Sequence, residues 1–126
     1  MPASKPSEMN GIRILVVEDT LLVAEMIRDE LTDLGYRVIG PVPRLEQGLR
    51  IAAAEGLDGA FLDVNLDGER SFAIADTLAA RGIRFAFLTG YGDGSIPPEY
   101  RDAPRLSKPF QMGDLAAMAR SFKAAV

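Results

Sequence analysis

The chain has 126 residues, which is enough for one hydrophobic core and too few for two, so we expect a single domain. Apolar residues make up 48% of the chain and charged residues 25%, the balance of a folded globular protein. The net charge of -4 argues against nucleic-acid binding, because such proteins carry basic surfaces that meet phosphates. The chain contains no cysteine and no histidine, which excludes disulfides, zinc sites, serine–histidine catalysis and a histidine phosphorylated within this chain.

The first eleven residues contain two prolines and no apolar run. We therefore expect a flexible tail over residues 1–11 and one domain over residues 12–126. No amino-terminal segment has the character of a signal peptide or membrane span, and no membrane partner is expected. A chain without cysteine is compatible with the reducing cytoplasm, where we expect the protein to act.

The amino-terminal half alternates short apolar runs with segments of helical periodicity. Residues 12–17 (IRILVV) form a β-branched run that predicts a strand buried on both faces. Residues 20–34 place apolar side chains at helical spacing, and Gly35 marks the end of that helix. A second strand is predicted over residues 36–42 and a second helix over residues 45–54.

The carboxyl-terminal half continues the alternation. Residues 59–63 (GAFLD) predict a buried strand that ends in a carboxylate, followed by a polar turn (NLDGE) and a helix over residues 71–80. Further strands are predicted over residues 83–88 and 104–107, and a final helix over residues 114–123. Strands alternating with helices predict an α/β domain, a doubly wound parallel sheet with helices on both faces, because parallel strands need right-handed crossovers.

Reactive side chains follow the predicted strands at their carboxyl ends, where doubly wound sheets bind ligands. They are Glu18, Asp19, Asp63, Thr89 and Lys108. Each alone has a structural explanation, such as a helix cap, a turn or a solvated charge, but their joint placement indicates a site. Three clustered carboxylates repel one another unless a cation compensates, and an all-oxygen ligand set suits magnesium. An aspartate beside magnesium, a lysine and a hydroxyl suits phosphoryl transfer, with Asp63 as the nucleophile.

This pattern resembles the receiver domains of bacterial two-component response regulators over about residues 12–124. The resemblance implies a flavodoxin-like sheet of five parallel strands in the order 2-1-3-4-5, in a stand-alone phosphoacceptor domain rather than an enzyme. It also implies that a partner sensor histidine kinase phosphorylates Asp63 with Mg2+, and that the signal passes to a downstream protein target or a phosphotransferase. The implied metal ligands are Glu18, Asp19, Asp63 and the Asn65 backbone carbonyl. The implied phosphoryl-binding and switch residues are Thr89, Gly90 and Lys108, and the peptide bond before Pro109 is a candidate cis bond.

Residues 87–92 (FLTGYG) also resemble the Phe-Ala-Thr-Gly-Tyr-Gly motif of a subgroup of single-domain receivers found mainly in alphaproteobacteria. That resemblance implies a soluble partner kinase from the same lineages, of the HWE or a related class, in stress or light signalling. Six residues do not identify the pathway.

Two features depart from the receiver pattern. Receivers carry an aromatic residue three positions before the lysine, and Arg105 stands there; Tyr91 is the alternative switch aromatic, or else it only packs. Residues 92–103 are rich in glycine and proline where receivers have a fourth helix, so we expect at most one helical turn, around residues 98–101. This loop either orders on phosphorylation or with a partner, or merely connects two strands.

Two other functional classes are open at this stage. A phosphorylation-independent interaction module would keep the receiver fold without its switch, and Arg105 makes this conceivable. A haloacid-dehalogenase-like phosphatase also uses an aspartate nucleophile with magnesium, but it needs a second aspartate two positions later, where Asn65 stands. The output of a receiver is either protein contact or the draining of phosphate from a kinase. For protein contact we expect the face formed by residues 92–103, the last strand and the last helix.

Overall fold

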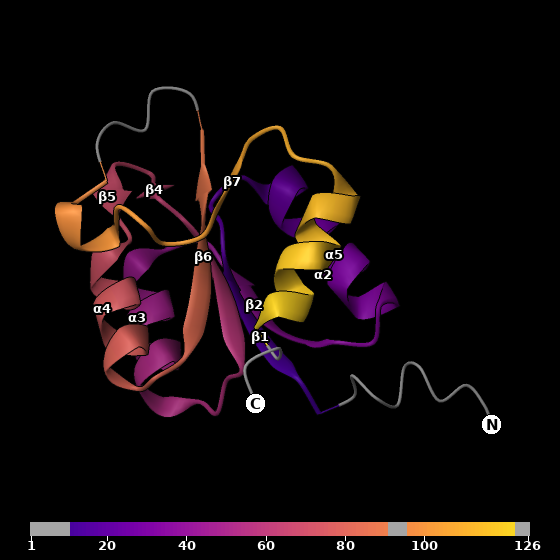
Figure 1. Cartoon of the computed structure of the whole chain (residues 1–126), viewed down its shortest axis with the longest axis horizontal. Helices are drawn as coiled ribbons and strands as arrows, with labels where there is room; N and C mark the ends of the chain where they lie inside the picture. The colour runs from indigo at the N-terminus through magenta and orange to yellow at the C-terminus, as the bar shows by residue number, and fades with distance from the viewer. Residues whose placement is uncertain (1–10, 91–95, 123–126) are drawn as a thin grey trace.

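A parallel sheet of five strands forms the centre of the molecule (Figure 1). The computed structural model describes residues 11–90 and 96–122. The strands lie in the order β2-β1-β3-β6-β7, which confirms the predicted doubly wound topology. In chain order they are β1 (Arg13–Val17), β2 (Arg37–Val42), β3 (Gly59–Asp63), β6 (Arg84–Thr89) and β7 (Arg105–Ser107).

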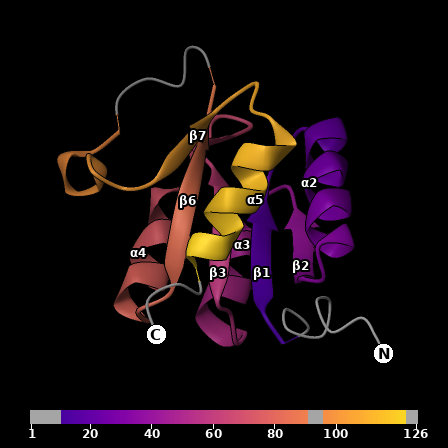
Figure 2. The same ribbon diagram turned by 45° about the vertical axis from the view of Figure 1, so that its right-hand side comes forward.

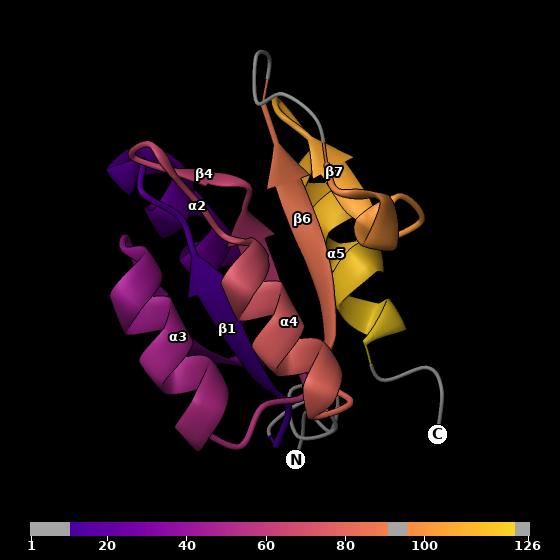
Figure 3. The same cartoon turned by 90° about the vertical axis from the view of Figure 1, so that its left-hand side faces the viewer.

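Helices cover both faces of the sheet. On one face lie α2 (Leu21–Asp33) and α5 (Met112–Ser121), and on the other lie α3 (Leu45–Ala54) and α4 (Phe72–Ala80) (Figures 1 and 3). Figure 2 shows α5 in front of the middle of the sheet, beside α2. Each face therefore has its own apolar core, because the central strands contribute side chains alternately to both. None of the helices in the described ranges is long and apolar enough to cross a bilayer.

The central strands are buried along nearly their whole length. All five residues of β3 are buried, as are four of the five in β1, which explains why both read as continuous apolar runs. Two glycines allow close packing around them. A Cβ atom on Gly48 of α3 would lie 2.6 Å from the Ile74 side chain, and one on Gly59 of β3 would lie 2.3 Å from the Phe122 ring. The first contact lets α3 pack closely against α4, and the second lets the end of α5 pack closely on β3.

Several local features differ from the sequence-based expectation or refine it. The polar turn after β3 is a small hairpin, β4 (Asn65–Leu66) and β5 (Glu69–Arg70). The last helix begins at Met112, two residues before its predicted start. The region expected to lack a full fourth helix holds one 3-10 turn, η1 (Pro98–Tyr100), which confirms the expected single turn. Apart from Gly11, the predicted tail lies outside the described residues.

Candidate functional site

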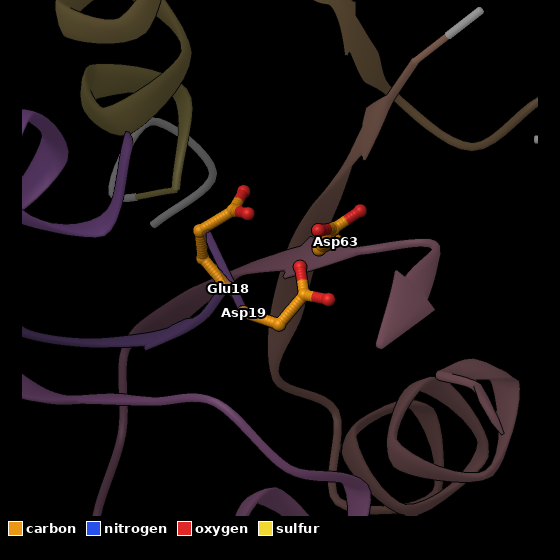
Figure 4. Close-up of side chains that lie close together, drawn as sticks. All are labelled: Glu18, Asp19 and Asp63. Carbon is orange, nitrogen blue, oxygen red and sulfur yellow. The ribbon is translucent and has the colours of Figure 1, made fainter. Parts of the chain in front are cut away.

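Two buried carboxylates stand at the ends of the central strands. Glu18 follows β1 and is 1% exposed, and Asp63 is the last residue of β3 and is 3% exposed. The Glu18 backbone N–H donates to the Val42 carbonyl at 3.0 Å, which extends the pairing with β2. Asp19, the next residue, is more exposed, and one carboxylate oxygen from each of the three acids lies within 4.8 Å of the others (Figure 4). The structure therefore brings together the three acids expected from the strand ends.

Lys108, which directly follows the edge strand β7, reaches this acidic cluster. Its ammonium Nζ lies 2.9 Å from Glu18 Oε1 and 3.2 Å from Asp63 Oδ2. Its backbone N–H donates to the Thr89 carbonyl at 2.7 Å, which ties the end of β7 to the end of β6. The peptide bond between Lys108 and Pro109 is cis, as is the bond between Gly40 and Pro41.

Burial and acidic neighbours oppose the ionisation of Asp63. Burial is the largest cause, the hydrogen bond and charge of Glu18 come next, and they raise the pKa of Asp63 to about 8 against the opposing charge of Lys108. Burial also disfavours the charged form of Lys108, but its interactions with Glu18 and Asp63 outweigh burial and raise its pKa. The lysine therefore stays charged at neutral pH, whereas full ionisation of Asp63 requires more positive charge nearby.

The hairpin after β3 adds backbone donors that the sequence analysis missed. The Asp67 N–H donates to Asp19 Oδ2 at 2.9 Å, and the Asn65 N–H donates to Asp63 Oδ1 at 3.3 Å. The turn depends on Asp67 and Gly68, whose φ angles are 52° and 91°. An Asp-Gly pair favours such a two-residue hairpin, so the signal was present in the sequence. The Asn65 side chain accepts from the Gly68 N–H at 2.9 Å and so belongs to the turn.

The expected switch residues lie at the end of β6. The Thr89 hydroxyl donates to the Leu106 carbonyl at 3.4 Å, a long bond to the neighbouring strand. Gly90 follows it and is half-buried. Tyr91, the alternative switch aromatic, lies outside the described residues, as do residues 92–95 of the expected loop. The Thr89 hydroxyl therefore faces β7 in this arrangement.

The donor atoms of the acidic cluster suit a divalent cation. Glu18, Asp19 and Asp63 offer carboxylate oxygens, the ligands that magnesium prefers. Within the described ranges, only Lys108 forms ion pairs with these acids, so three carboxylates face one ammonium group. The excess negative charge and the close spacing of the oxygens fit a magnesium ion. The role of the Asn65 backbone carbonyl as a further metal ligand stays a prediction.

Arg105 occupies the position where the sequence analysis expected an aromatic residue. Its guanidinium donates to the carbonyls of Tyr100 at 3.1 Å, Arg101 at 2.6 Å and Ala103 at 3.3 Å. From the start of the edge strand β7, its side chain therefore binds the end of the 3-10 turn. A different aromatic residue, Tyr100, is buried beneath that turn against the Phe87 ring of β6, at a centroid distance of 5.6 Å.

Solved structures share this fold over most of the chain. SdrG from Sphingomonas melonis Fr1 is 43% identical; the match covers 88% of this chain and 94% of SdrG, with a TM-score of 0.77. The BeF3-activated conformation of SdrG from Pseudomonas melonis Fr1 is 42% identical, with the same coverage and a TM-score of 0.71. The receiver domain of the sensor histidine kinase PA1611 from Pseudomonas aeruginosa PAO1, which has a magnesium ion in its active site cleft, is 24% identical. That match covers 89% of this chain and 97% of that domain, with a TM-score of 0.73, and shows the fold alone.

Sequence comparison finds a weaker resemblance. The transcriptional regulatory protein PdtaR from Mycobacterium tuberculosis is 27% identical over 111 residues, which cover 82% of this chain. The chain spans about half the length of PdtaR, 52%. No family model matches the chain. The structural neighbours are response regulator receiver domains, and SdrG shares both the fold and 43% of its residues with the chain. The chain therefore belongs to the response regulator receiver domains of two-component signalling.

Proposed function

We propose that this receiver takes a phosphoryl group onto Asp63 from a phosphohistidine of a partner sensor histidine kinase, with Mg2+ bound beside it. The observation that carries the proposal is the position of the Asp63 carboxylate. It ends the central strand, shares a 4.8 Å cluster with Glu18 and Asp19, and accepts from Lys108 at 3.2 Å. An acidic group that only stabilised the fold would gain nothing from two further carboxylates at the edge where such sheets bind ligands.

The residues around Asp63 have separate roles in this reaction. A carboxylate oxygen of Asp63 forms the bond to phosphorus while the bond from phosphorus to the histidine nitrogen breaks, and the leaving imidazole keeps the electron pair. Lys108 holds its positive charge beside Asp63 Oδ2, where it stabilises the phosphoryl oxygens. The Thr89 hydroxyl would leave the Leu106 carbonyl and donate to one phosphoryl oxygen.

Glu18, Asp19 and Asp63 would hold the magnesium ion, with the Asn65 backbone carbonyl as a further protein ligand. When bound, magnesium neutralises negative charge on the phosphoryl oxygens. The raised pKa of Asp63 supports this assignment, because a nearby cation favours the ionised carboxylate that attacks phosphorus.

An apolar surface next to the site supports a protein as the phosphodonor. Leu21 and Leu22 at the start of α2 are 72% and 68% exposed, and Met26 one turn later is 46% exposed. Beside them lies a hollow of about 280 Å³, and Lys108 lines it too. Its lining residues are Val23, Met26, Ile27, Lys108, Pro109, Phe110 and Met112. We assign this α2 surface to the kinase, because exposed apolar groups beside a reactive site mark a protein contact.

We further propose that the kinase is of the HWE or a related class. The resemblance of residues 87–92 to the Phe-Ala-Thr-Gly-Tyr-Gly motif of single-domain receivers supports this assignment. The phosphorylated protein passes the signal either through protein contacts at β7 and α5 or to a phosphotransferase. Lys108 follows β7 directly and forms an ion pair with Glu18, so this output face begins next to the acidic cluster.

Intact-protein mass spectrometry after incubation with acetyl phosphate tests the acceptor assignment. Wild type should gain one phosphoryl adduct only when magnesium is present, and Asp63→Asn should gain none. Asp67→Asn is the matched control, because Asp67 is an exposed acid in the adjacent hairpin and should leave the adduct unchanged. An adduct that persists on Asp63→Asn would refute the assignment.

The kinase surface has a separate test. Leu22→Glu should leave phosphorylation by acetyl phosphate unchanged, since that donor needs no docking, and should slow transfer from a phosphorylated HWE-class kinase. Ala117→Glu, an exposed position on α5, is the control. Equal transfer rates for both variants would exclude the α2 surface as the kinase contact.

One observation favours a second function, a phosphorylation-independent interaction module. Arg105 binds three carbonyl groups instead of providing the usual aromatic side chain. On that reading the Asp63→Asn protein would bind its output partner as tightly as the phosphorylated wild type does. Loss of partner binding in Asp63→Asn would remove this alternative.

A further inference from the structure

The segment that replaces the fourth helix is held by one buried aromatic side chain. Tyr100 is 9% exposed, whereas its neighbours Pro98 and Glu99 are exposed. Its ring contacts three phenylalanine rings at centroid distances of 5.6 to 6.2 Å. These rings are Phe72 of α4 and Phe85 and Phe87 of β6. Figure 1 shows the turn, in orange, on the same side of the sheet as α4.

The same side chain is also bound at its polar end. The Tyr100 hydroxyl donates to Asp76 Oδ1 of α4. Burial, followed by the hydrogen bond and charge of Asp76, raises the pKa of Tyr100, so the hydroxyl keeps its proton and stays a donor. A hydrogen bond to a carboxylate is stronger than one between neutral groups. Tyr100 therefore joins η1 to α4 through both its ring and its hydroxyl.

Arg105 holds the other end of the turn. Its guanidinium donates to the carbonyls of Tyr100, Arg101 and Ala103 at the end of the turn. The Tyr100 carbonyl also accepts from the Ala103 backbone N–H at 3.1 Å. Arg105 also begins β7 and pairs with Phe87 of β6. One arginine thus connects the turn to the edge strand.

This edge strand also carries the acceptor of the Thr89 hydroxyl. Thr89 donates to the carbonyl of Leu106, the residue after Arg105. Phe87, which packs on Tyr100, lies two residues before Thr89 on β6. The Thr89 hydroxyl and the Tyr100 ring are therefore linked through adjacent positions of β6 and β7. A displacement of Thr89 toward Asp63 would disturb both contacts.

We propose that Tyr100 and Arg105 form a latch that holds η1 against α4 in the unphosphorylated protein, and that this latch opposes the movement of Thr89 toward a phosphoryl group on Asp63. The inference rests on the proposed function. The contacts of Tyr100 with Asp76 and of Thr89 with Leu106 stabilise the same state, so a variant without the first contact shifts the equilibrium toward the activated state. The stability of the latch therefore sets how much free energy the binding of a phosphoryl group or its mimic must supply to reach the activated state.

Titration with beryllium fluoride and magnesium, followed by 19F NMR of the bound ligand, tests the latch. BeF3- attaches to an aspartate in place of the phosphoryl group and needs no kinase. Tyr100→Phe and Arg105→Ala should each bind BeF3- roughly threefold to tenfold more tightly than wild type, because a lost hydrogen bond of about 1 kcal/mol changes an affinity by that much. Tyr36→Phe and Arg101→Ala are the controls: Tyr36 is buried on the opposite face of the sheet, and Arg101 is exposed in the same turn.

Each outcome decides the proposal. Tighter binding by the two latch variants and unchanged binding by the two controls supports it. Unchanged or weaker binding by the latch variants overturns it while leaving the proposed function intact. If wild type binds no BeF3-, the proposed function fails and the latch fails with it. Asp76→Ala, an exposed change on α4, tests the same hydrogen bond from its acceptor if Tyr100→Phe does not fold.

Discussion

The two arms of the proposed phosphoryl site are built from opposite kinds of interaction. The acidic arm gathers Glu18, Asp19 and Asp63, which repel one another in the metal-free protein. The switch arm, from β6 to β7, rests on four aromatic rings and on the hydrogen bonds of Tyr100 and Arg105. The acidic arm is thus unfavourable to the fold until a cation binds, whereas the switch arm stabilises the fold without a ligand.

This difference shows how one small domain separates ligand binding from response. Repulsion among the carboxylates around Asp63 favours the binding of a cation, because a positive charge relieves that repulsion. Packing of Tyr100 against Phe87 and Phe72 holds η1 against β6 and α4 without any ligand. Variants in the two arms should therefore change stability in opposite directions.

The largest expected effect is a loss of stability in the switch arm. Phe87 is fully buried and contacts the rings of Phe72, Phe85 and Tyr100, so Phe87→Ala leaves a cavity among them. We expect the free energy of unfolding to fall by about 3–5 kcal/mol. Urea denaturation monitored by circular dichroism measures it. A loss below about 1 kcal/mol would show that the aromatic cluster collapses into the gap and is not rigid.

The next effect is a gain of stability in the acidic arm. The pKa of Asp63 rises from 3.8 to about 8 on folding, so the folded metal-free protein favours the protonated group. Wild type should lose stability as the pH rises from about 4 to about 8, whereas Asp63→Asn cannot ionise and should not. In EDTA at pH 8 we expect Asp63→Asn to be more stable by at least about 1 kcal/mol, the equivalent of one pKa unit. At pH 4 the difference should vanish, and a constant gap across this range would contradict the assignment.

A third effect is stabilisation by magnesium. At ten times its dissociation constant, magnesium should raise the free energy of unfolding by about 1.4 kcal/mol, because it binds the folded state alone. Thermal unfolding with and without EDTA measures the shift. Asp19→Asn should lose most of it, and Asp33→Asn, an exposed acid at the end of α2, should keep it. Equal shifts in both variants would place the cation elsewhere.

The smallest effect concerns the hairpin that positions Asp19 and Asp63. Gly68 has a φ of 91° and open space around it, so Gly68→Ala meets backbone strain rather than a clash. We expect it to lower stability by about 1 kcal/mol and to weaken magnesium binding. Gly113→Ala in α5 is the matched control, because it also has open space but sits in a helix, where alanine is favoured. If both substitutions stabilise, the turn is not restrained by Gly68.

Most of the fold could be predicted from the sequence because its signals are local. The apolar runs of β1 and β3 and the helical spacing of α2 determine where elements begin and end. Once the strands are parallel, their carboxyl ends must meet, so the grouping of Glu18, Asp19 and Asp63 followed from the strand positions alone. The short turn near Pro98 was also predictable, because proline and glycine prevent a longer helix there.

Other features depended on contacts between distant segments. The sequence places Arg105 where an aromatic residue was expected but does not show that Tyr100, five residues earlier, fills the core beside Phe87. The hydrogen bond from Tyr100 to Asp76 spans 24 residues, and the bond from the Asp67 amide to Asp19 spans 48. The amino-acid sequence by itself therefore determined the strands, the helices and the acidic site, which arise from local periodicity and a general rule of sheet geometry. Only the tertiary structure decided how the switch arm is held, because side-chain packing between elements has no local signal in the chain.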